Sequence, residues 1–323
     1  MKSIAVAVLV AGLVPAAAPA LAQPPRDPAL LVPQEAPPLA YTAVEPAVSL
    51  PDGIEMGASA AVAFDASGHL FVLTRGEPAL WEFDAGGRFV RAFGEGLFMR
   101  SHGLHIDGEG NLWVADVGAH VVLKLDRDGR VLMTLGTPGE AGAWDEATGE
   151  RHLDQPNDIA VAPNGHIFVA QGHLPGERGD PRVLKFDRTG TLLAQWGGKG
   201  SGPGQFQVAH GVALDAQGDV WVMDRENSRI QIFGADGTYR REMAYAGLPC
   251  GVAIGTDAVF MVNGFTGQIV KLGLDGAVLG AVGRAGKGLG EFGEAHYIAA
   301  SPTGELFVAD TVNRNLHKFV PAP

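Results

Sequence analysis

The chain has 323 residues, a formal net charge of −12 and a single cysteine, Cys250. An acidic protein does not attract phosphate backbones or anionic bilayers, so neither nucleic acid nor a membrane surface is an expected partner. One cysteine cannot form an intramolecular disulfide, so the fold must be held by its own core. The 46 glycines and the scarcity of helical periodicity favour many short strands joined by tight turns.

The first residues are typical of a secretory signal. Residues 1–22 contain an early Lys2, an apolar stretch over residues 4–14 and the small-residue cleavage pattern Ala20-Leu21-Ala22. The apolar stretch is too short to span a bilayer. We therefore expect export, to the periplasm or the medium.

A Pro-rich leader is expected over residues 23–40, followed by one domain over residues 41–323. Within that domain one template recurs six times, and its clearest copy is residues 208–233. Each copy opens an apolar strand, turns at a Gly-containing segment and continues into a second apolar strand. The strand-opening positions align at Ala60, His102, Asn157, His210, Cys250 and His296.

Intervals of 40 to 55 residues with several strands per unit are typical of a β-propeller. The second strands are predicted at 70–74, 112–116, 167–171, 220–224, 259–263 and 306–310. The sixth unit stops after its third strand, and an unfinished sheet would expose an edge. A strand within residues 41–50 is the natural donor of the missing strand. We therefore predict an all-β, six-bladed propeller closed by an N-terminal strand in the last blade. The repeat copies, of which residues 208–233 are the clearest, resemble NHL repeats.

Three of the six strand-opening positions are histidines, His102, His210 and His296, and they fall in alternate units. The first strand of each blade lines the central channel, so three imidazoles from alternate blades should converge on one point. Three histidines with a fourth position left open form a typical catalytic zinc site. The sequence therefore predicts zinc bound by these three residues; for any one of them alone, a hydrogen-bonded channel histidine would be the simpler interpretation.

Four further residues are candidates for chemistry. Arg75 and Arg225 follow the second strand in units one and four, so they should face each other across the axis and clamp a carboxylate; the alternative is a salt bridge to a rim carboxylate. His173 lies near the same level in unit three and is a candidate acid or base. Glu294 lies two residues before His296 and is either a channel residue or a solvated rim charge.

From about residue 57 to residue 319 the chain resembles the peptidyl-α-hydroxyglycine α-amidating lyase family. The resemblance rests on the motifs SHGL, VAHGV and EAHYI, the phrase DRENSRIQ and the QPNDIAV unit. It implies a zinc-binding propeller that cleaves the N–Cα bond of a peptidyl-α-hydroxyglycine to a peptide amide and glyoxylate. The family's zinc histidines match His102, His210 and His296, and its functional arginines match Arg75 and Arg225.

The chain also departs from the family pattern. The family's catalytic tyrosine is replaced by His173, a methionine by Glu294, and a calcium-binding aspartate by Tyr297. Calcium, whose carbonyl ligands would be Val62 and Leu104, is thereby made doubtful. Proton transfer would fall to His173, Glu294 or Tyr297.

Three functions therefore stay open. The first is a zinc-dependent lyase acting on a hydroxyglycine-like small molecule or peptide. The second is a metal-dependent hydrolase or lactonase on the same propeller. The third is a non-catalytic NHL-repeat binding protein. A closed propeller needs no partner subunit, so we expect a monomer.

Overall fold

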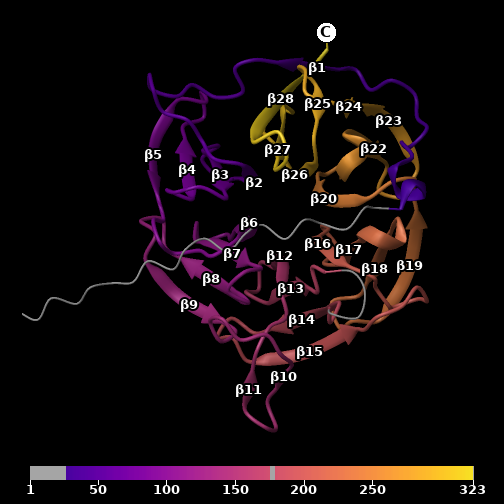
Figure 1. Ribbon diagram of the computed structural model, residues 1–323. Helices are drawn as coiled ribbons and strands as arrows, with labels where there is room; N and C mark the ends of the chain where they lie inside the picture. Colours follow the sequence, from indigo (N-terminus) through magenta and orange to yellow (C-terminus); the bar gives the residue numbers. More distant parts are fainter. Residues whose placement is uncertain (1–26, 175–178, 323) are drawn as a thin grey trace, which may run out of the picture.

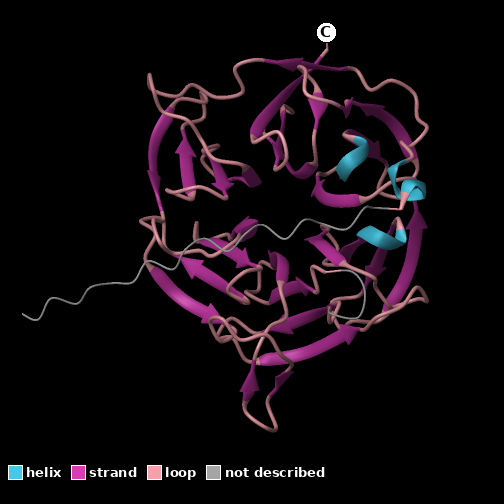
Figure 2. Cartoon of the chain, viewed as in Figure 1, coloured by secondary structure: helices cyan, strands magenta, loops and turns pink. Residues whose placement is uncertain are grey.

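The computed structural model describes residues 27–174 and 179–322. The predicted signal peptide lies outside these residues, as does the start of the predicted leader. None of the helices in the described part of the chain has the length and apolar character needed to cross a bilayer. Within residues 27–174 and 179–322 the helical content consists of three short 3-10 turns, and the rest is strand and loop (Figure 2).

Six four-stranded antiparallel sheets are arranged around a central axis as the blades of a propeller (Figure 1). The prediction of six blades is therefore confirmed. Blade one comprises β2 (Ser59–Phe64), β3 (Leu70–Thr74), β4 (Leu80–Phe83) and β5 (Phe89–Phe93). Blade two comprises β6 (Ser101–Ile106), β7 (Leu112–Asp116), β8 (Val121–Leu125) and β9 (Val131–Leu135). Blade three comprises β12 (Pro156–Val161), β13 (Ile167–Gln171), β14 (Arg182–Phe186) and β15 (Leu192–Gly197). Blade four comprises β16 (Ala209–Leu214), β17 (Val220–Asp224), β18 (Arg229–Phe233) and β19 (Tyr239–Ala244). Blade five comprises β20 (Pro249–Ile254), β21 (Val259–Asn263), β22 (Gln268–Leu272) and β23 (Val278–Val282). Blade six comprises β26 (Ala295–Ala300), β27 (Leu306–Asp310), β28 (Asn315–Pro321) and β1 (Tyr41–Val44).

The ring is closed by the N-terminal strand, as predicted. β1 pairs antiparallel with β28, with Tyr41 opposite Pro321 and Val44 opposite Lys318. The phenol of Tyr41 also donates to the carbonyl oxygen of Gly304 at 2.9 Å. The first and last strands of the domain thus share one blade, so the outer edge of β28 is paired.

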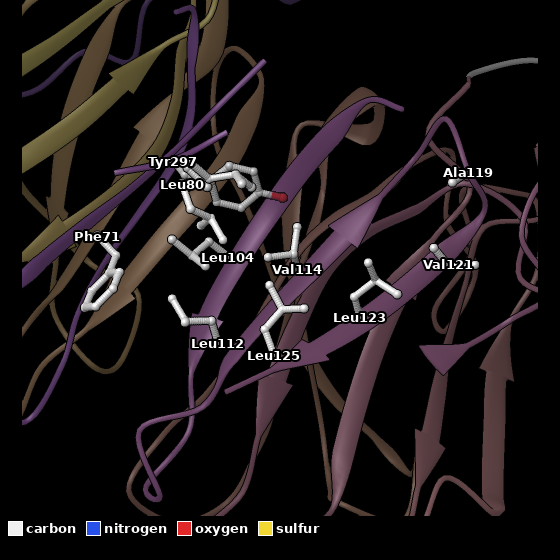
Figure 3. Close-up of a cluster of buried hydrophobic side chains, with 12 residues drawn as sticks. Phe71, Leu80, Leu104, Leu112, Val114, Ala119, Val121, Leu123, Leu125 and Tyr297 are labelled. Carbon is white, nitrogen blue, oxygen red and sulfur yellow. The ribbon is translucent and has the colours of Figure 1, made fainter. Parts of the chain in front are cut away.

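Apolar packing between neighbouring blades forms the core. The second strands β3, β7, β13, β17 and β27 are buried at every residue, because each has a blade on both faces. The outer strand β15 instead alternates half-buried with exposed residues. One of these inter-blade clusters joins Phe71 and Leu80 of blade one to Leu104, Leu112 and Val114 of blade two (Figure 3).

A register shift interrupts the innermost ladder of every blade at its strand-opening position. In blade two the pairing of β6 with β7 passes from Ser101 to Leu104, and in blade four that of β16 with β17 passes from Ala209 to Gly211. Equivalent shifts occur in the other four blades. A bulge leaves its residue unpaired and re-aims the side chain. The bulges therefore explain why the side chains at the strand-opening positions point toward the channel.

The described part of the leader runs along the outer edge of the ring. After the turn η1 (Pro28–Leu31), Gln34 exchanges hydrogen bonds with Gln268 of blade five, its backbone N–H donating at 2.7 Å and its carbonyl accepting at 3.1 Å. Pro38 then forms a parallel bridge with Ala281 on β23. The long spacer between blades two and three forms a separate hairpin, β10 (Trp144–Asp145) with β11 (Glu150–Arg151), which projects outward from the ring (Figure 1).

Candidate metal centre and channel site

Three buried histidines meet on the propeller axis. His102 comes from β6, His210 from β16 and His296 from β26, and the nearest ligand-type atoms of all three lie within 4.8 Å of one another. Their ring centroids are 4.6 to 5.0 Å apart. Among the described residues no other group of three or more His, Cys, Asp or Glu side chains has this arrangement. The alternation read from the sequence thus brings three imidazoles to one point, which can hold a metal ion.

Each of these imidazoles is held by a backbone carbonyl of the following blade. The Nδ1 atoms of His102, His210 and His296 lie 2.8, 3.0 and 2.7 Å from the carbonyl oxygens of Asn157, Cys250 and Ala60. These three acceptors are the remaining strand-opening positions of the six. A carbonyl oxygen only accepts, so each Nδ1 must carry the proton. The lone pair of each ring is therefore on Nε2, the form of histidine that binds a metal.

The Nε2 atoms provide a test of whether the site fits a metal ion. Those of His102 and His210 are buried and have no hydrogen-bond partner among the described residues. Burial, followed by the neighbouring imidazoles, holds the pKa of His102 well below its usual value, and burial together with Arg225 does the same for the pKa of His210. The pKa of His296 is lowered to about 4, mainly by burial. Three neutral, buried imidazoles, two of them with an unpartnered Nε2, are a donor set that suits a divalent metal.

The His-Gly dipeptide has a steric role in this ring. A Cβ added to Gly103 would lie 2.5 Å from the carbonyl oxygen of Asn157, and one added to Gly211 would lie 2.6 Å from that of Cys250. These are the carbonyls that accept from the preceding histidines. The absence of a side chain at Gly103 and Gly211 thus permits the close approach of blades that fixes the imidazoles.

The two predicted arginines both lie at the channel. Arg225, in the turn η2 (Arg225–Asn227), is buried and forms an ion pair with Glu226 at 2.8 Å. Arg75 follows β3, and its Nε is buried with no hydrogen-bond partner among the described residues. Burial, Arg100 and Arg225 lower the pKa of Arg75 to about 10, so it stays charged at neutral pH. Asp116, a carboxylate that could have formed the alternative salt bridge, instead accepts the backbone N–H groups of Met99 and Arg100.

Glu294 is a channel residue and is only 6% exposed. Its carboxylate accepts from the Thr311 hydroxyl at 2.5 Å. Burial opposes ionisation, but His296 and Arg225 together with that hydrogen bond and Arg75 lower the pKa of Glu294 below its usual value. Its negative charge thus partly balances the two guanidiniums, which excludes the solvated rim position considered from the sequence.

His173 lies beside the triad. Its ring centroid is 4.6 Å from that of His102 and 5.9 Å from that of His210. The Nδ1 of His173 is 2.8 Å from Oδ1 of Asn157. Burial, followed by His102 and Arg225, holds the pKa of His173 well below its usual value. A neutral imidazole is therefore present where the resemblance implies a tyrosine.

Tyr297 fills the channel next to the triad. It is buried, and its hydroxyl lies 2.9 Å from the carbonyl oxygen of His210 and 3.2 Å from that of Asn157. Burial, followed by Asp158, raises the pKa of Tyr297 well above its usual value. Its phenol links blades three, four and six, and it supplies no carboxylate for the calcium that the resemblance implies.

Sequence reasoning missed three residues of this site. Thr311 directly follows β27, as Arg75 follows β3 and Arg225 follows β17. Alignment of the residues that follow each second strand would therefore have identified Thr311 as a channel residue. Arg100, two residues before His102, acts electrostatically on both Arg75 and His173. The side chain of Asn157 contacts His173, a pairing between residues on different elements that no spacing in the sequence indicates.

Comparison with known proteins agrees with this architecture. The NHL repeat family matches residues 206–233. A probable peptidyl-alpha-hydroxyglycine alpha-amidating lyase of Caenorhabditis elegans is 39% identical over 183 residues, covering 54% of this chain and 49% of the relative. The chain is a homologue of the peptidyl-α-hydroxyglycine α-amidating lyases. The resemblance inferred from the His motifs is thereby confirmed.

A second amidating relative covers more of this chain. The peptidylglycine alpha-amidating monooxygenase of Rattus norvegicus is 34% identical over 250 residues, which are 71% of this chain and 24% of that protein. The chain thus spans about half or less of the length of these two relatives. Among solved structures, a gluconolactonase from Xanthomonas campestris superposes with a TM-score of 0.60 over 90% of this chain and 99% of its own, at 18% identity. At that identity the likeness shows the propeller fold alone.

Proposed function

We propose that the protein is a zinc-dependent lyase that cleaves the N–Cα bond of an N-acyl or peptidyl α-hydroxyglycine, giving an amide and glyoxylate. The observation that carries the proposal is the convergence of three neutral imidazoles beside two arginines, Arg225, which is buried, and Arg75, whose Nε is buried. On the pattern of residues 1–22, we propose that it acts outside the cytoplasm.

His102, His210 and His296 would hold the metal through Nε2. Three neutral nitrogen ligands with room for a fourth are typical of catalytic zinc rather than of a closed structural site. A bound zinc ion would act as a Lewis acid toward an oxygen of the substrate. The carbonyls of Asn157 and Cys250 keep two of the ligands in the required tautomer.

The arginines would hold the carboxylate of the hydroxyglycine. The buried Nε of Arg75 has no partner among the described residues, and a charged donor in that state is stabilised by an anionic acceptor. Arg225 shares its charge with Glu226, and the adjacent carboxylate raises the pKa of Arg225 although burial opposes it. A substrate without a carboxylate would leave Arg75 unpaired. The site therefore selects for an acidic small molecule or peptide end.

His173 would act as the base. Because its Nδ1 is bonded to Asn157, Nε2 is the atom that takes the proton from the substrate hydroxyl. As the O–H bond breaks, its electrons form the aldehyde C=O, the N–Cα bond breaks, and the nitrogen keeps that electron pair and takes a proton. The products are the amide and glyoxylate, and no water is consumed.

The first test is metal content by elemental analysis. We expect about one zinc per chain in the wild type, a loss of metal in His210→Ala, and no change in His166→Ala, whose ring lies at a turn beside Asn164. A wild type that takes up no metal even when zinc is supplied would contradict the proposal and favour a non-catalytic NHL-repeat protein.

The second test is glyoxylate release from α-hydroxyhippurate. Loss of glyoxylate formation in His173→Ala with metal content retained would support the role of His173 as the base. Zinc binding without glyoxylate release, combined with hydrolysis of lactones, would identify the hydrolase instead.

A further inference from the structure

We propose that Asn157 is a positioning residue that sets the tautomer of His173, in addition to holding the metal-side imidazole of His102. The expected effect on kcat rests on the proposed lyase function, whereas the tautomer of His173 can be measured without turnover. Asn157 is fully buried on β12, at the bulge of blade three.

The orientation of the Asn157 amide is fixed by its second hydrogen bond. Its Nδ2 donates to the carbonyl oxygen of Ala209 at 2.8 Å, and Ala209 directly precedes His210. A carbonyl accepts only, so the NH2 group must face Ala209 and Oδ1 must face His173. Oδ1 in turn only accepts, so the Nδ1 of His173, at 2.8 Å, must donate. The amide therefore leaves the lone pair of His173 on Nε2.

One residue thus orients two imidazoles by the same rule. The backbone carbonyl of Asn157 accepts from Nδ1 of His102, and its side-chain carbonyl accepts from Nδ1 of His173. The two rings lie 4.6 Å apart between centroids. Any shift of Asn157 would move both the proposed base and a proposed ligand, so their relative position is set at a single residue.

The tautomer decides what His173 can do. With the proton on Nδ1, Nε2 is free to accept a proton from a substrate hydroxyl. In the other tautomer Nε2 carries a hydrogen and can only donate, and the ring is no longer a base at that atom. Removal of the Asn157 amide would therefore lower kcat while leaving the arginines that bind the carboxylate in place.

The test is ¹⁵N NMR of histidine-labelled protein, with the His173 ring assigned by its absence in His173→Ala. In the metal-free and zinc-loaded wild type we expect a protonated Nδ1 and an unprotonated Nε2. In Asn157→Ala we expect a mixture of tautomers or the Nε2-H form. In Asn157→Asp, which keeps an acceptor toward His173, we expect the wild-type tautomer.

The matched control is Asn263→Ala. Asn263 is also fully buried, and its side-chain amide also makes two hydrogen bonds, but both are to backbone groups beside blade five. Its Oδ1 accepts from the N–H of Leu248, and its Nδ2 donates to the carbonyl oxygen of Ala246. A loss of stability alone should be similar in both alanine variants, whereas the tautomer change should occur only at position 157. We expect kcat for glyoxylate release to fall about tenfold or more in Asn157→Ala, with KM little changed and with recovery in Asn157→Asp.

A proton on Nε2 of His173 in the unmodified protein would overturn the proposal even if no alanine variant folds. So would an unchanged tautomer in Asn157→Ala, or an equal fall of kcat in Asn263→Ala. Absence of glyoxylate in the wild type, with the expected tautomers present, would remove the lyase proposal and leave the positioning of His173 by Asn157 standing.

Discussion

The Nδ1 of His296, in the last blade, lies 2.7 Å from the carbonyl oxygen of Ala60, in the first. This hydrogen bond joins residues 236 positions apart, so it forms only when the ring is closed. The other two members of the triad bond to carbonyls 55 and 40 positions away. Closure of the propeller therefore also orients the imidazole of His296, whereas His102 and His210 are oriented by the next blade along the chain. Four predictions follow from this coupling and from the charges around it.

Replacement of Gly211 by alanine should weaken metal binding. The added Cβ would lie 2.6 Å from the carbonyl oxygen of Cys250, which must move and thereby release Nδ1 of His210. Loss of such an orienting hydrogen bond typically costs about tenfold to a hundredfold in metal affinity. Competition with a chelator would measure it. Gly108→Ala is the control, since a Cβ there meets nothing within 4 Å; equal affinities for both variants would contradict the steric role of Gly211.

Replacement of Arg75 by glutamine should raise KM for α-hydroxyhippurate. A hydrogen bond to a charged group contributes about 1.5–3 kcal/mol, so kcat/KM should fall roughly tenfold or more. The methyl ester of the same substrate lacks the carboxylate, and its turnover should change little. Arg240→Gln is the control, because that side chain is 56% exposed and pairs with Asp219 away from the channel. Equal losses on acid and ester would place the carboxylate elsewhere.

Asp158 should make the wild type less stable as pH rises. Burial raises the pKa of this carboxyl to about 8, above its ordinary value of 3.8. Between those values the folded state binds the proton that the unfolded state releases, so the free energy of unfolding falls with increasing pH and levels off above pH 8. Each pH unit between 3.8 and about 8 lowers the free energy of unfolding by about 1.4 kcal/mol.

Urea denaturation of Asp158→Asn across pH 4 to 9 would measure this penalty. The amide cannot ionise, so the difference in unfolding free energy between variant and wild type should grow in favour of the variant up to about pH 8. A difference that is constant with pH would show that Asp158 does not carry the proton.

Deletion of residues 1–44 should destabilise the ring, because β28 would lose its partner β1 and expose an edge. We expect a lower melting temperature and self-association, measured by calorimetry and size-exclusion chromatography. Deletion of residues 1–32 is the control, since it keeps Gln34, Pro38 and β1. Monomeric, equally stable products of both deletions would contradict a role for β1 in closure.

The sequence by itself determined the blades and the alternation of histidines among them. The second strands, residues 70–74 and 306–310 among them, were readable because a strand buried between two blades is apolar throughout, and because tight turns require glycine at positive φ, as at Gly218. The recurrence of one template also placed His102, His210 and His296 at one level of the ring. These patterns are local or repeat at regular intervals, so they can be recognised in one sequence without knowledge of the tertiary structure.

Only the tertiary structure decided how those histidines are oriented. The bulge at each strand-opening position, the carbonyl that fixes each Nδ1 and the pairing of His173 with Asn157 all depend on contacts between blades. The burial of Glu294 and the unpaired Nε of Arg75 likewise depend on which groups face one another across the channel. Such contacts join residues tens to hundreds of positions apart, and no spacing in the sequence encodes the direction of a hydrogen bond between them.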